Sequence, residues 1–491
     1  MTIQKPIFLT SAIPYVNAEP HLGHALELVQ SDAIARYQRL RGRELHFTSG
    51  TDDNSLKNVR AASTLGITPA ELVARNGAGF LRLAQALNVV HDDFIHTASD
   101  ARHAPAVQAL WQRCVNSGDV YKNTYRGLYC VGCEHFLRES ETRDGKCTVH
   151  PQPLEVVAEE NWFFRLSRYE QPILQAISEG RLQILPLERK HEALQFIAGG
   201  LTDFSISRSR SRAHAWGIAV PGDDTQIVYV WFDALANYLS VLGYPNGELF
   251  QHYWLNANER WHILGKDILR FHALYWPGIL LSAGLPLPTS LRVHGHITSQ
   301  GKKIGKSSGN ALDPWRLVAR YGVDAVRYYL LAHLHTSKDS DFREDLLRTA
   351  YGSELAGKLG NLLQRVCALV ERNGVTIVTR NLDAPLCELA WHTERRVARA
   401  FDEFALHDAL RAIFELITAA NRHADSSAPW QLAKQENFTA LEHCLSSLVY
   451  TLRVTARLLA PFLPATAREI AARLDPQPKL GAPLFPALPR A

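Results

Sequence analysis

The chain has 491 residues, of which 46% are hydrophobic and 21% are charged, and its formal net charge is +4. This composition excludes an intrinsically disordered protein and allows about two to four domains. The small charge excludes a dedicated basic arm for nucleic acid, although it permits a polyanionic partner. No apolar run reaches the length of a membrane span, because Gly and Pro interrupt the longest one at 273–288. We therefore expect a globular cytoplasmic protein that does not bind membranes.

The first fifty residues predict a strand, a helix and a second strand. Residues 7–13 are apolar and β-prone, and Pro14 ends this run. At 26–40 apolar residues recur every three or four positions, which is typical of an amphipathic helix. A second β-prone run follows at 44–49. The unit is therefore βαβ, and the fold class is α/β with a parallel sheet.

Two histidines precede the expected helix, in the sequence His21-Leu22-Gly23-His24. At this position unpaired backbone N–H groups and the helix dipole favour an anion. Both imidazoles could donate to a phosphate, and Gly23 would let a planar ring approach the backbone. Two surface histidines that only cap the helix are the alternative, unless a second phosphate-binding loop exists in the chain.

The segment Gly50-Thr51-Asp52-Asp53-Asn54 comes directly after the second strand. It therefore lies at the carboxyl edge of the sheet, where α/β folds bind their ligands.

Between about 116 and 215 the alternation of strands and helices stops, which indicates an insertion into the sheet domain. Four residues there form two pairs, Cys130 with Cys133 and Cys147 with His150. Two such knuckles supply the four ligands of a tetrahedral structural zinc and leave no open position for catalysis. A disulfide is the alternative, and a cytoplasmic setting disfavours it.

The second half of the sheet domain is predicted from three strands at 226–231, 261–264 and 291–293 and from two helices, one that follows the first strand up to residue 242 and one at 268–281. A loop rich in glycine and lysine follows at 298–310, and it contains Lys302, Lys303 and Lys306. Such a loop suits a lid that closes on phosphates. It is the second phosphate-binding element that favours a phosphate role for the two histidines.

From 348 to 474 the pattern is helical almost throughout, and a proline-rich tail follows at 475–491. We predict five segments: the first half of the sheet domain, the insertion, the second half, a segment supporting the lysine loop, and a helical domain. Their bounds are 1–115, 116–215, 216–320, 321–347 and 348–491.

Two motifs carry a resemblance to a known family. His21-Leu22-Gly23-His24 resembles the His-Ile-Gly-His signature of class I aminoacyl-tRNA synthetases, and Lys303-Ile304-Gly305-Lys306-Ser307 resembles their Lys-Met-Ser-Lys-Ser loop. Within that class the chain is most similar to the methionyl-tRNA synthetase family over nearly its whole length, with further matches at 14–17, 229–234 and 265–272. The resemblance implies a Rossmann-type sheet, a zinc-bearing insertion and a helical anticodon-binding domain.

By the same resemblance, the chain would attach methionine to its tRNA through methionyl-adenylate, using ATP with Mg²⁺ and holding Zn²⁺ as a structural metal. His21, His24, Lys303 and Lys306 would be catalytic by stabilising charge on phosphate oxygens. Gly23 and Ser307 would complete the ATP site.

Two further sets of residues follow from the resemblance. Aromatic and aliphatic groups suit a thioether, and a carboxylate suits an amine. The methionine site would consist of Ile13, Tyr15, Asp52, Trp231, Tyr238, Ile268 and His272. Unpaired anticodon bases need stacking and hydrogen-bonding partners. These would be Asn361, Arg365, Pro429 and Trp430.

Two departures from the family pattern leave alternatives open. Asp53-Asn54-Ser55 stands where the family usually has Glu-His-Gly, and Ile304-Gly305 replaces Met-Ser. A catalytically impaired, tRNA-binding regulatory paralogue is one alternative, which the retained histidines and lysines disfavour. An adenylating enzyme that loads another carrier is the second, which the anticodon residues disfavour. The sequence ends after the helical domain, without the appended tRNA-binding module of many dimeric relatives, so we expect a monomer.

Overall fold

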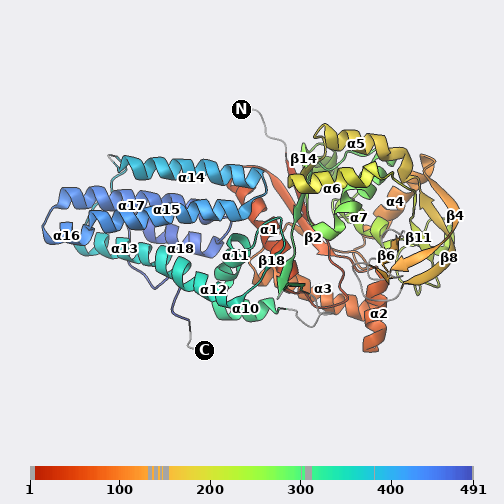
Figure 1. Cartoon of the computed structure of the whole chain (residues 1–491), viewed down its shortest axis with the longest axis horizontal. Helices are drawn as coiled ribbons and strands as arrows, with labels where there is room; N and C mark the ends of the chain where they lie inside the picture. The colour runs from red at the N-terminus through yellow and green to blue at the C-terminus, as the bar shows by residue number, and fades with distance from the viewer. Residues whose placement is uncertain are drawn as a thin grey trace. The chain divides into compact units, whose positions relative to one another are not determined.

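The computed structural model describes residues 6–130, 135–137, 142–143, 146–147, 154–299, 301–304, 312–380 and 382–488 (Figure 1). Backbone contacts divide the chain into two units. Unit 1 comprises Met1–Pro20, Gly42–Gln85 and Val90–His294. Unit 2 comprises His21–Arg41, Ala86–Val89 and Gly295–Ala491.

Six strands of unit 1 form one parallel sheet in the order β3, β2, β1, β14, β15 and β9. The predicted α/β class with a parallel sheet is therefore confirmed. β1 and β15 are buried along their whole length, as expected for a parallel sheet that is covered on both faces. The strands are β1 (Ile7–Ser11), β2 (Leu45–Thr51), β3 (Asp93–His96), β9 (Gln183–Leu185), β14 (Glu259–Gly265) and β15 (Ser290–His294).

One predicted strand of this sheet, at 226–231, is wrong. β13 (Asp223–Val228) ends earlier and pairs antiparallel with β11 (Ser207–Ser209) and β12 (Ala219–Val220) in a separate three-stranded sheet. Helix α7 (Val230–Ser240) begins two residues later, so Trp231 lies in a first helical turn. A continuous apolar run has no period that separates a buried strand from a buried helix, which explains the error.

The stretch predicted as an insertion consists mainly of antiparallel strands. β4 (Val120–Cys130) pairs with β8 (Glu155–Phe164) along nearly its whole length. β9 comes from the same stretch but pairs with β15, so this stretch also supplies the edge of the parallel sheet. The shorter elements are β5 (His135–Leu137), β6 (Thr142–Arg143), β7 (Lys146–Cys147), β10 (Phe204–Ser205), α5 (Glu170–Ser178) and α6 (Leu187–Ala198).

The helix predicted at 268–281 is present, but its hydrogen-bonding pattern changes along its length. It begins with a 3₁₀ turn at Lys266–Ile268, continues as a π-helical turn at Phe271–Tyr275 and ends as α9 (Trp276–Ser282). The described part of unit 1 contains four further α-helices. They are α2 (Leu56–Leu65), α3 (Pro69–Ala86), α4 (His103–Asn116) and α8 (Glu248–Phe250).

Among the described residues, unit 2 is helical apart from a small sheet of β16 (Ile297–Ser299), β17 (Lys302–Lys303) and β18 (Ser340–Asp341). The prediction of helices across 348–474 is confirmed, and α14, α15 and α17 pack side by side (Figure 1). None of the described helices combines the length and the apolar character that crossing a bilayer requires. The helices are α1 (Leu22–Leu40), α10 (Pro314–Tyr321), α11 (Val323–Ala332), α12 (Glu344–Ala350), α13 (Asn361–Asn373), α14 (Ala384–Asp402), α15 (Leu406–Ser427), α16 (Pro429–Lys434), α17 (Phe438–Leu459) and α18 (Pro464–Leu474), with a π-helical stretch at Tyr351–Gly360.

A buried arginine fastens α1 within unit 2. Arg327 of α11 is 0% exposed, and its guanidinium lies 2.6 Å from the carboxylate of Asp32 in α1. The same guanidinium donates to the carbonyl oxygens of Phe462, Leu87 and Pro461 at 2.7, 3.1 and 3.1 Å. A buried charge needs such a full set of partners, because losing one leaves an uncompensated group. The helix that carries the two histidines is therefore rigidly placed in unit 2.

Candidate active site

The carboxyl edge of the parallel sheet brings Tyr15 and Asp52 together. The two residues form an isolated parallel bridge, and the Asp52 N–H donates to the Pro14 carbonyl at 2.8 Å. Asp52 is only 2% exposed. Beside them, a Cβ on Gly50 would lie 2.3 Å from a carbonyl oxygen of β3 and 3.2 Å from Cγ2 of Ile13, so glycine is required mainly by the neighbouring strand and also makes room for Ile13. Three predicted site residues therefore share one edge of unit 1.

Aromatic rings from three elements meet in unit 1, in an aromatic cluster formed by Tyr15, Trp231, Tyr238, Phe271 and His272. Trp231 stacks on Phe271, with ring centroids 3.7 Å apart and an interplanar angle of 4°. It also meets Tyr15 edge to face at 6.4 Å. The prediction missed Phe271, although Phe271 immediately precedes His272 in the sequence. A face of stacked rings beside a carboxylate can take an amine with an apolar, polarizable side chain.

Within the aromatic cluster, the direction of the hydrogen bond between Tyr238 and His272 can be assigned. Nδ1 of His272 lies 2.9 Å from the Ile268 carbonyl, which can only accept, so Nδ1 carries the proton. Nε2 then accepts from the Tyr238 hydroxyl at 2.8 Å. Burial lowers the pKa of His272 to about 4, against the Ile268 hydrogen bond, which raises it. His272 therefore presents a neutral ring at physiological pH.

The two histidines of unit 2 form a reciprocal cap at the start of α1. Nδ1 of His21 accepts from the Gly23 N–H at 3.1 Å, and Nδ1 of His24 accepts from the His21 N–H at 3.1 Å. Their rings stack 3.9 Å apart. Because each Nδ1 is an acceptor, a neutral ring carries its proton on Nε2. The cap and the phosphate role are thus not alternatives, since capping fixes the tautomer that can donate to an anion.

Gly23 leaves the space that the His21 ring occupies. A Cβ at this position would lie 2.9 Å from Cε1 and 3.0 Å from Nδ1 of His21. We expect Gly23→Ala to displace the ring and lower the catalytic rate by about 10- to 100-fold, since small misplacements have such effects. Stability should not fall, because alanine favours helix. Gly352→Ala is the control, because a Cβ there meets nothing within 4 Å. Unchanged activity of Gly23→Ala, measured beside its melting temperature, would contradict this role.

The lysine loop starts in a small sheet, where Asp341 of β18 forms hydrogen bonds to β16 and to the turn before β17. Oδ1 of Asp341 accepts from the Thr298 hydroxyl at 3.0 Å and from the Gly301 N–H at 3.1 Å. Thr298 pairs with Lys303 across β16 and β17. Lys306 and Ser307 lie outside the described residues. After the loop, the Leu312 carbonyl accepts from the Leu22 N–H at 3.3 Å, so the segment that follows the lysine loop contacts the start of α1 within unit 2.

The predicted anticodon residues gather on adjoining helices of unit 2. Asn361 and Arg365 lie one turn apart on α13. The Arg365 guanidinium lies 5.1 Å from the centroid of the Trp430 ring and 2.8 Å from the Asp425 carboxylate. Trp430 is 38% exposed and follows the buried Pro429 at the start of α16. An exposed indole next to a guanidinium can stack with an unpaired base.

Half of the predicted zinc site can be located. Cys130 at the end of β4 and Cys147 at the end of β7 are buried in one small cluster with Leu154. Cys133 and His150 lie outside the described residues. Two thiol-bearing strand ends buried side by side fit two ligands of one metal site.

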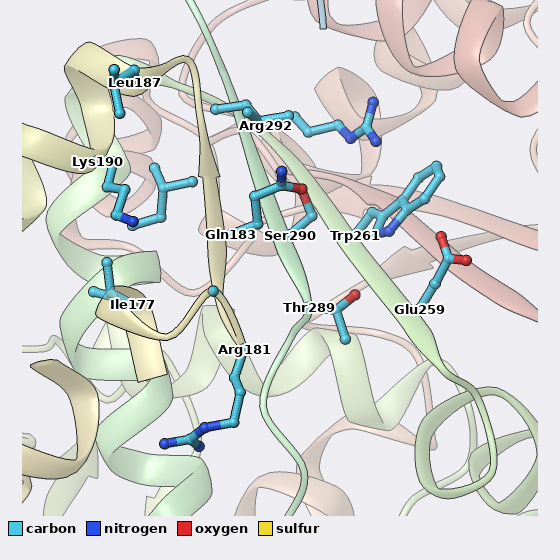
Figure 2. A pocket seen from close by; sticks show the side chains of 13 residues that line it. Ile177, Arg181, Gln183, Leu187, Lys190, Glu259, Trp261, Thr289, Ser290 and Arg292 are labelled. Carbon is cyan, nitrogen blue, oxygen red and sulfur yellow. The ribbon is translucent and has the colours of Figure 1, made fainter. Parts of the chain in front are cut away.

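Figure 2 shows a cleft of about 640 Å³ in unit 1, and none of the predicted site residues that the structure describes lines it. Gln183, Glu259 and Ser290 line it, and each is the first residue of its strand. Parallel sheets bind their ligands at the opposite, carboxyl ends of the strands. The Arg292 guanidinium in the cleft lies over the Trp261 ring at 4.2 Å. The cleft is therefore not the catalytic centre.

The three residues after Asp52 that depart from the family pattern all make hydrogen bonds in unit 1. Ser55 caps α2 by accepting from the Asn58 N–H at 3.2 Å. Oδ2 of Asp53 accepts from the Ala98 N–H at 3.2 Å. Burial raises the pKa of Asp53 to about 6, and that backbone hydrogen bond opposes the rise. The amide of Asn54 donates to the Asp233 carboxylate at 2.9 Å, a contact that the sequence did not predict.

The chain matches two family models and several known proteins. The model described as tRNA synthetases class I (M) matches residues 7–152 and 139–367, and an anticodon-binding domain of tRNA ligase matches 390–489. A methionine–tRNA ligase of Brucella suis is 40% identical over 94% of this chain and 90% of its own length. The corresponding ligase of Rhizobium meliloti is 38% identical, over 95% and 91%.

A solved structure gives the same result. Methionyl-tRNA synthetase of Mycobacterium tuberculosis in complex with methionyl-adenylate superposes with a TM-score of 0.90. The sequences are 38% identical, and the match covers 99% of each chain. The Rossmann-type sheet and the helical anticodon-binding domain implied by the resemblance are thereby confirmed. The chain therefore belongs to the methionyl-tRNA synthetase family of the class I tRNA synthetases.

Proposed function

We propose that this chain attaches methionine to its tRNA in two steps through methionyl-adenylate. The observation that carries the proposal is the meeting of Asp52 with the aromatic cluster at the carboxyl edge of the sheet. The stacked rings offer a polarizable surface for the thioether, and the buried carboxylate offers a partner for the ammonium group. Ile13 and Ile268 complete the site. Family membership over nearly the whole chain supports the same activity.

In the first step a carboxylate oxygen of methionine attacks the α-phosphorus of ATP, and the bond to the β-phosphate breaks. Negative charge grows on the phosphate oxygens as pyrophosphate leaves. His21 and His24 donate from Nε2, and Lys303 and Lys306 add positive charge, so these residues stabilise that charge without transferring a proton. We propose that Mg²⁺ accompanies the nucleotide. Gly23 and Ser307 contact the nucleotide.

In the second step a ribose hydroxyl at the end of the tRNA attacks the methionyl carbonyl, and AMP leaves. The anticodon is read separately, by Asn361, Arg365, Pro429 and Trp430. The stacked guanidinium and indole at 5.1 Å support this assignment. We further propose that the enzyme is a cytoplasmic monomer, which light scattering and cell fractionation can check.

Methionine-dependent exchange of pyrophosphate into ATP tests the first step. We expect exchange with methionine and little with leucine or isoleucine. No exchange with any amino acid would favour the regulatory paralogue. Exchange without subsequent charging of tRNA would favour an enzyme that loads another carrier.

Trp430→Ala should weaken the charging of tRNA and leave pyrophosphate exchange unchanged. Loss of one stacked base costs about 1–3 kcal/mol, so we expect an increase of about 5- to 150-fold in the KM for tRNA. Trp391→Ala is a matched control, because Trp391 is also exposed and also has an arginine, Arg395, 4.8 Å from its ring. Equal effects of the two substitutions, or a parallel loss of exchange, would contradict the anticodon assignment.

We propose that Cys130, Cys133, Cys147 and His150 hold a structural zinc ion. The burial of Cys130 and Cys147 in one cluster supports the site. Metal analysis should give about one zinc per chain, and Cys147→Ser should release it, because a missing thiolate leaves a ligand position unfilled. Cys444→Ser, which alters a buried cysteine of α17, should keep the metal. A wild-type protein free of zinc after purification without chelators would refute the assignment.

A further inference from the structure

Asn54 lies at the carboxyl edge of the sheet in unit 1 and contacts helix α7. It follows Asp52 by two residues, so it shares the loop that holds the proposed ammonium partner. Its Nδ2 donates to Oδ2 of Asp233 at 2.9 Å. Asp233 belongs to the first turn of α7, two residues after Trp231. One hydrogen bond therefore joins the loop of Asp52 to the helix of the aromatic cluster.

The hydrogen bond between Asn54 and Asp233 continues into a series of polar contacts that reaches the last residue of α7. Asp233 is 1% exposed, and its Oδ1 contacts Nε2 of the fully buried His103 in α4. Nδ1 of His103 lies 2.8 Å from the hydroxyl of Ser240, the last residue of α7. Both ends of this helix are thus fixed to α4 through a single imidazole. Buried polar groups with complete partners rigidify their surroundings.

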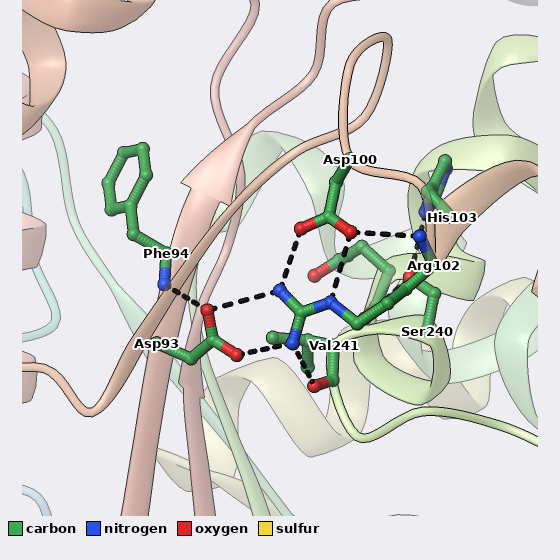
Figure 3. A network of polar contacts seen from close by, with 8 residues as sticks. Asp93, Phe94, Asp100, Arg102, His103, Ser240 and Val241 are labelled. Atoms are coloured by element: carbon green, nitrogen blue, oxygen red, sulfur yellow. Dashed lines mark hydrogen bonds and ion pairs between the residues drawn. The ribbon is translucent and has the colours of Figure 1, made fainter. Parts of the chain in front are cut away.

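A neighbouring arginine holds the end of the same helix (Figure 3). The Arg102 guanidinium donates to Asp93 at 2.6 Å, to Asp100 at 2.7 Å and to the Val241 carbonyl at 3.0 Å. It thereby ties the start of β3 and the loop before α4 to the residue after α7. Arg102 and His103 thus fix α7 to β3 and α4, and Asn54 provides a polar link between α7 and the Asp52 loop.

We infer that Asn54 is a positioning residue of the amino-acid site, which sets the place of Trp231 and Tyr238 relative to Asp52 through its hydrogen bond to Asp233. The inference rests on the proposed function. An amide suits this role because it donates to a carboxylate without adding charge. A carboxylate at position 54 would instead face Asp233 beside the buried Asp53, and like charges in a buried site repel strongly.

Kinetics of methionine-dependent pyrophosphate exchange test the inference. Asn54→Ala should raise the KM for methionine by about tenfold or more, since a hydrogen bond to a charged group is lost, while the KM for ATP stays unchanged. Asn54→Asp should raise the KM for methionine more than Asn54→Ala does. Asn54→His should retain most of the affinity, because its Nδ1–H takes the place of the asparagine Nδ2 and can donate to Asp233. Asn116→Ala, at the exposed end of α4, is the control and should behave as wild type.

A double variant separates positioning from general destabilisation. If Asn54 acts through Asp233, then Asn54→Ala combined with Asp233→Asn should cost less than the product of the single effects. Unchanged methionine KM in Asn54→Ala, or equal rises in the KM for both substrates, would overturn the inference. Should Asn54→Ala fail to fold, the ranking of Asn54→His above Asn54→Asp in calorimetric methionine binding decides instead. If the wild type itself fails to exchange pyrophosphate in the presence of methionine, the proposed function is refuted. That result differs from an unchanged methionine KM in Asn54→Ala, which overturns only the inference about Asn54.

Discussion

Replacing Lys306 by alanine should lower the rate of methionyl-adenylate formation by about 10²- to 10³-fold, the typical effect of removing one group that stabilises transition-state charge. The affinity for methionine should hardly change, because the positive charge matters mainly when the phosphate oxygens become more negative. Single-turnover measurement of adenylate formation, beside equilibrium binding of methionine, separates the two quantities.

Lys302→Ala is the matched control, since Lys302 lies in the same loop but outside the signature match. It should change the rate by only a few fold, because the resemblance gives Lys302 no contact with the phosphates. Lys303→Ala should fall between the two. Equal losses of rate and methionine affinity in Lys306→Ala would contradict a role confined to the transition state.

The order of strands and helices in the catalytic half could largely be read from periodicity and turn residues. β1, α1 and β2 lie where the first fifty residues predict them, although α1 begins at Leu22 rather than Leu26. This earlier start has a physical reason, because His21 and His24 cap the helix with their own side chains. Propensity rules recognise Ser, Thr, Asp and Asn as caps and give histidine little weight.

The failures concern features that only tertiary structure determines. Strand β9 has three residues, too few to show any period, and it belongs to the sheet only because it pairs with β15. The run around Trp231 is apolar throughout, so the sequence could not distinguish the end of β13 from the start of α7.

The site, too, has residues that the sequence could predict and contacts that it could not. Motif resemblance identified Tyr15, Asp52, Trp231, Tyr238 and His272, and the structure brings these residues together in unit 1. The partners of Asn54 could not be predicted, because Asp233 lies 179 positions away in the sequence. A departure from a family motif reveals a difference but not the contact that compensates for it.

Asp52→Asn should raise the KM for methionine by about 10²-fold or more, because the substitution removes the charge that balances a buried ammonium group and preserves the side-chain shape. The fold should survive, since the backbone contacts of Asp52 with Pro14 and with the Asn58 amide do not involve its carboxylate. Steady-state exchange kinetics provide the measurement.

A methionine analogue in which hydrogen replaces the amino group supplies the chemical control. In the wild type this analogue brings no ammonium group to pair with the buried carboxylate of Asp52, and this penalty should make it a weak inhibitor. In Asp52→Asn that penalty disappears, so the analogue should bind the variant as well as or better than the wild type, even though methionine binds the variant far less tightly. If the variant loses affinity for methionine and for the analogue by the same factor, Asp52 shapes the pocket and does not pair with the ammonium group.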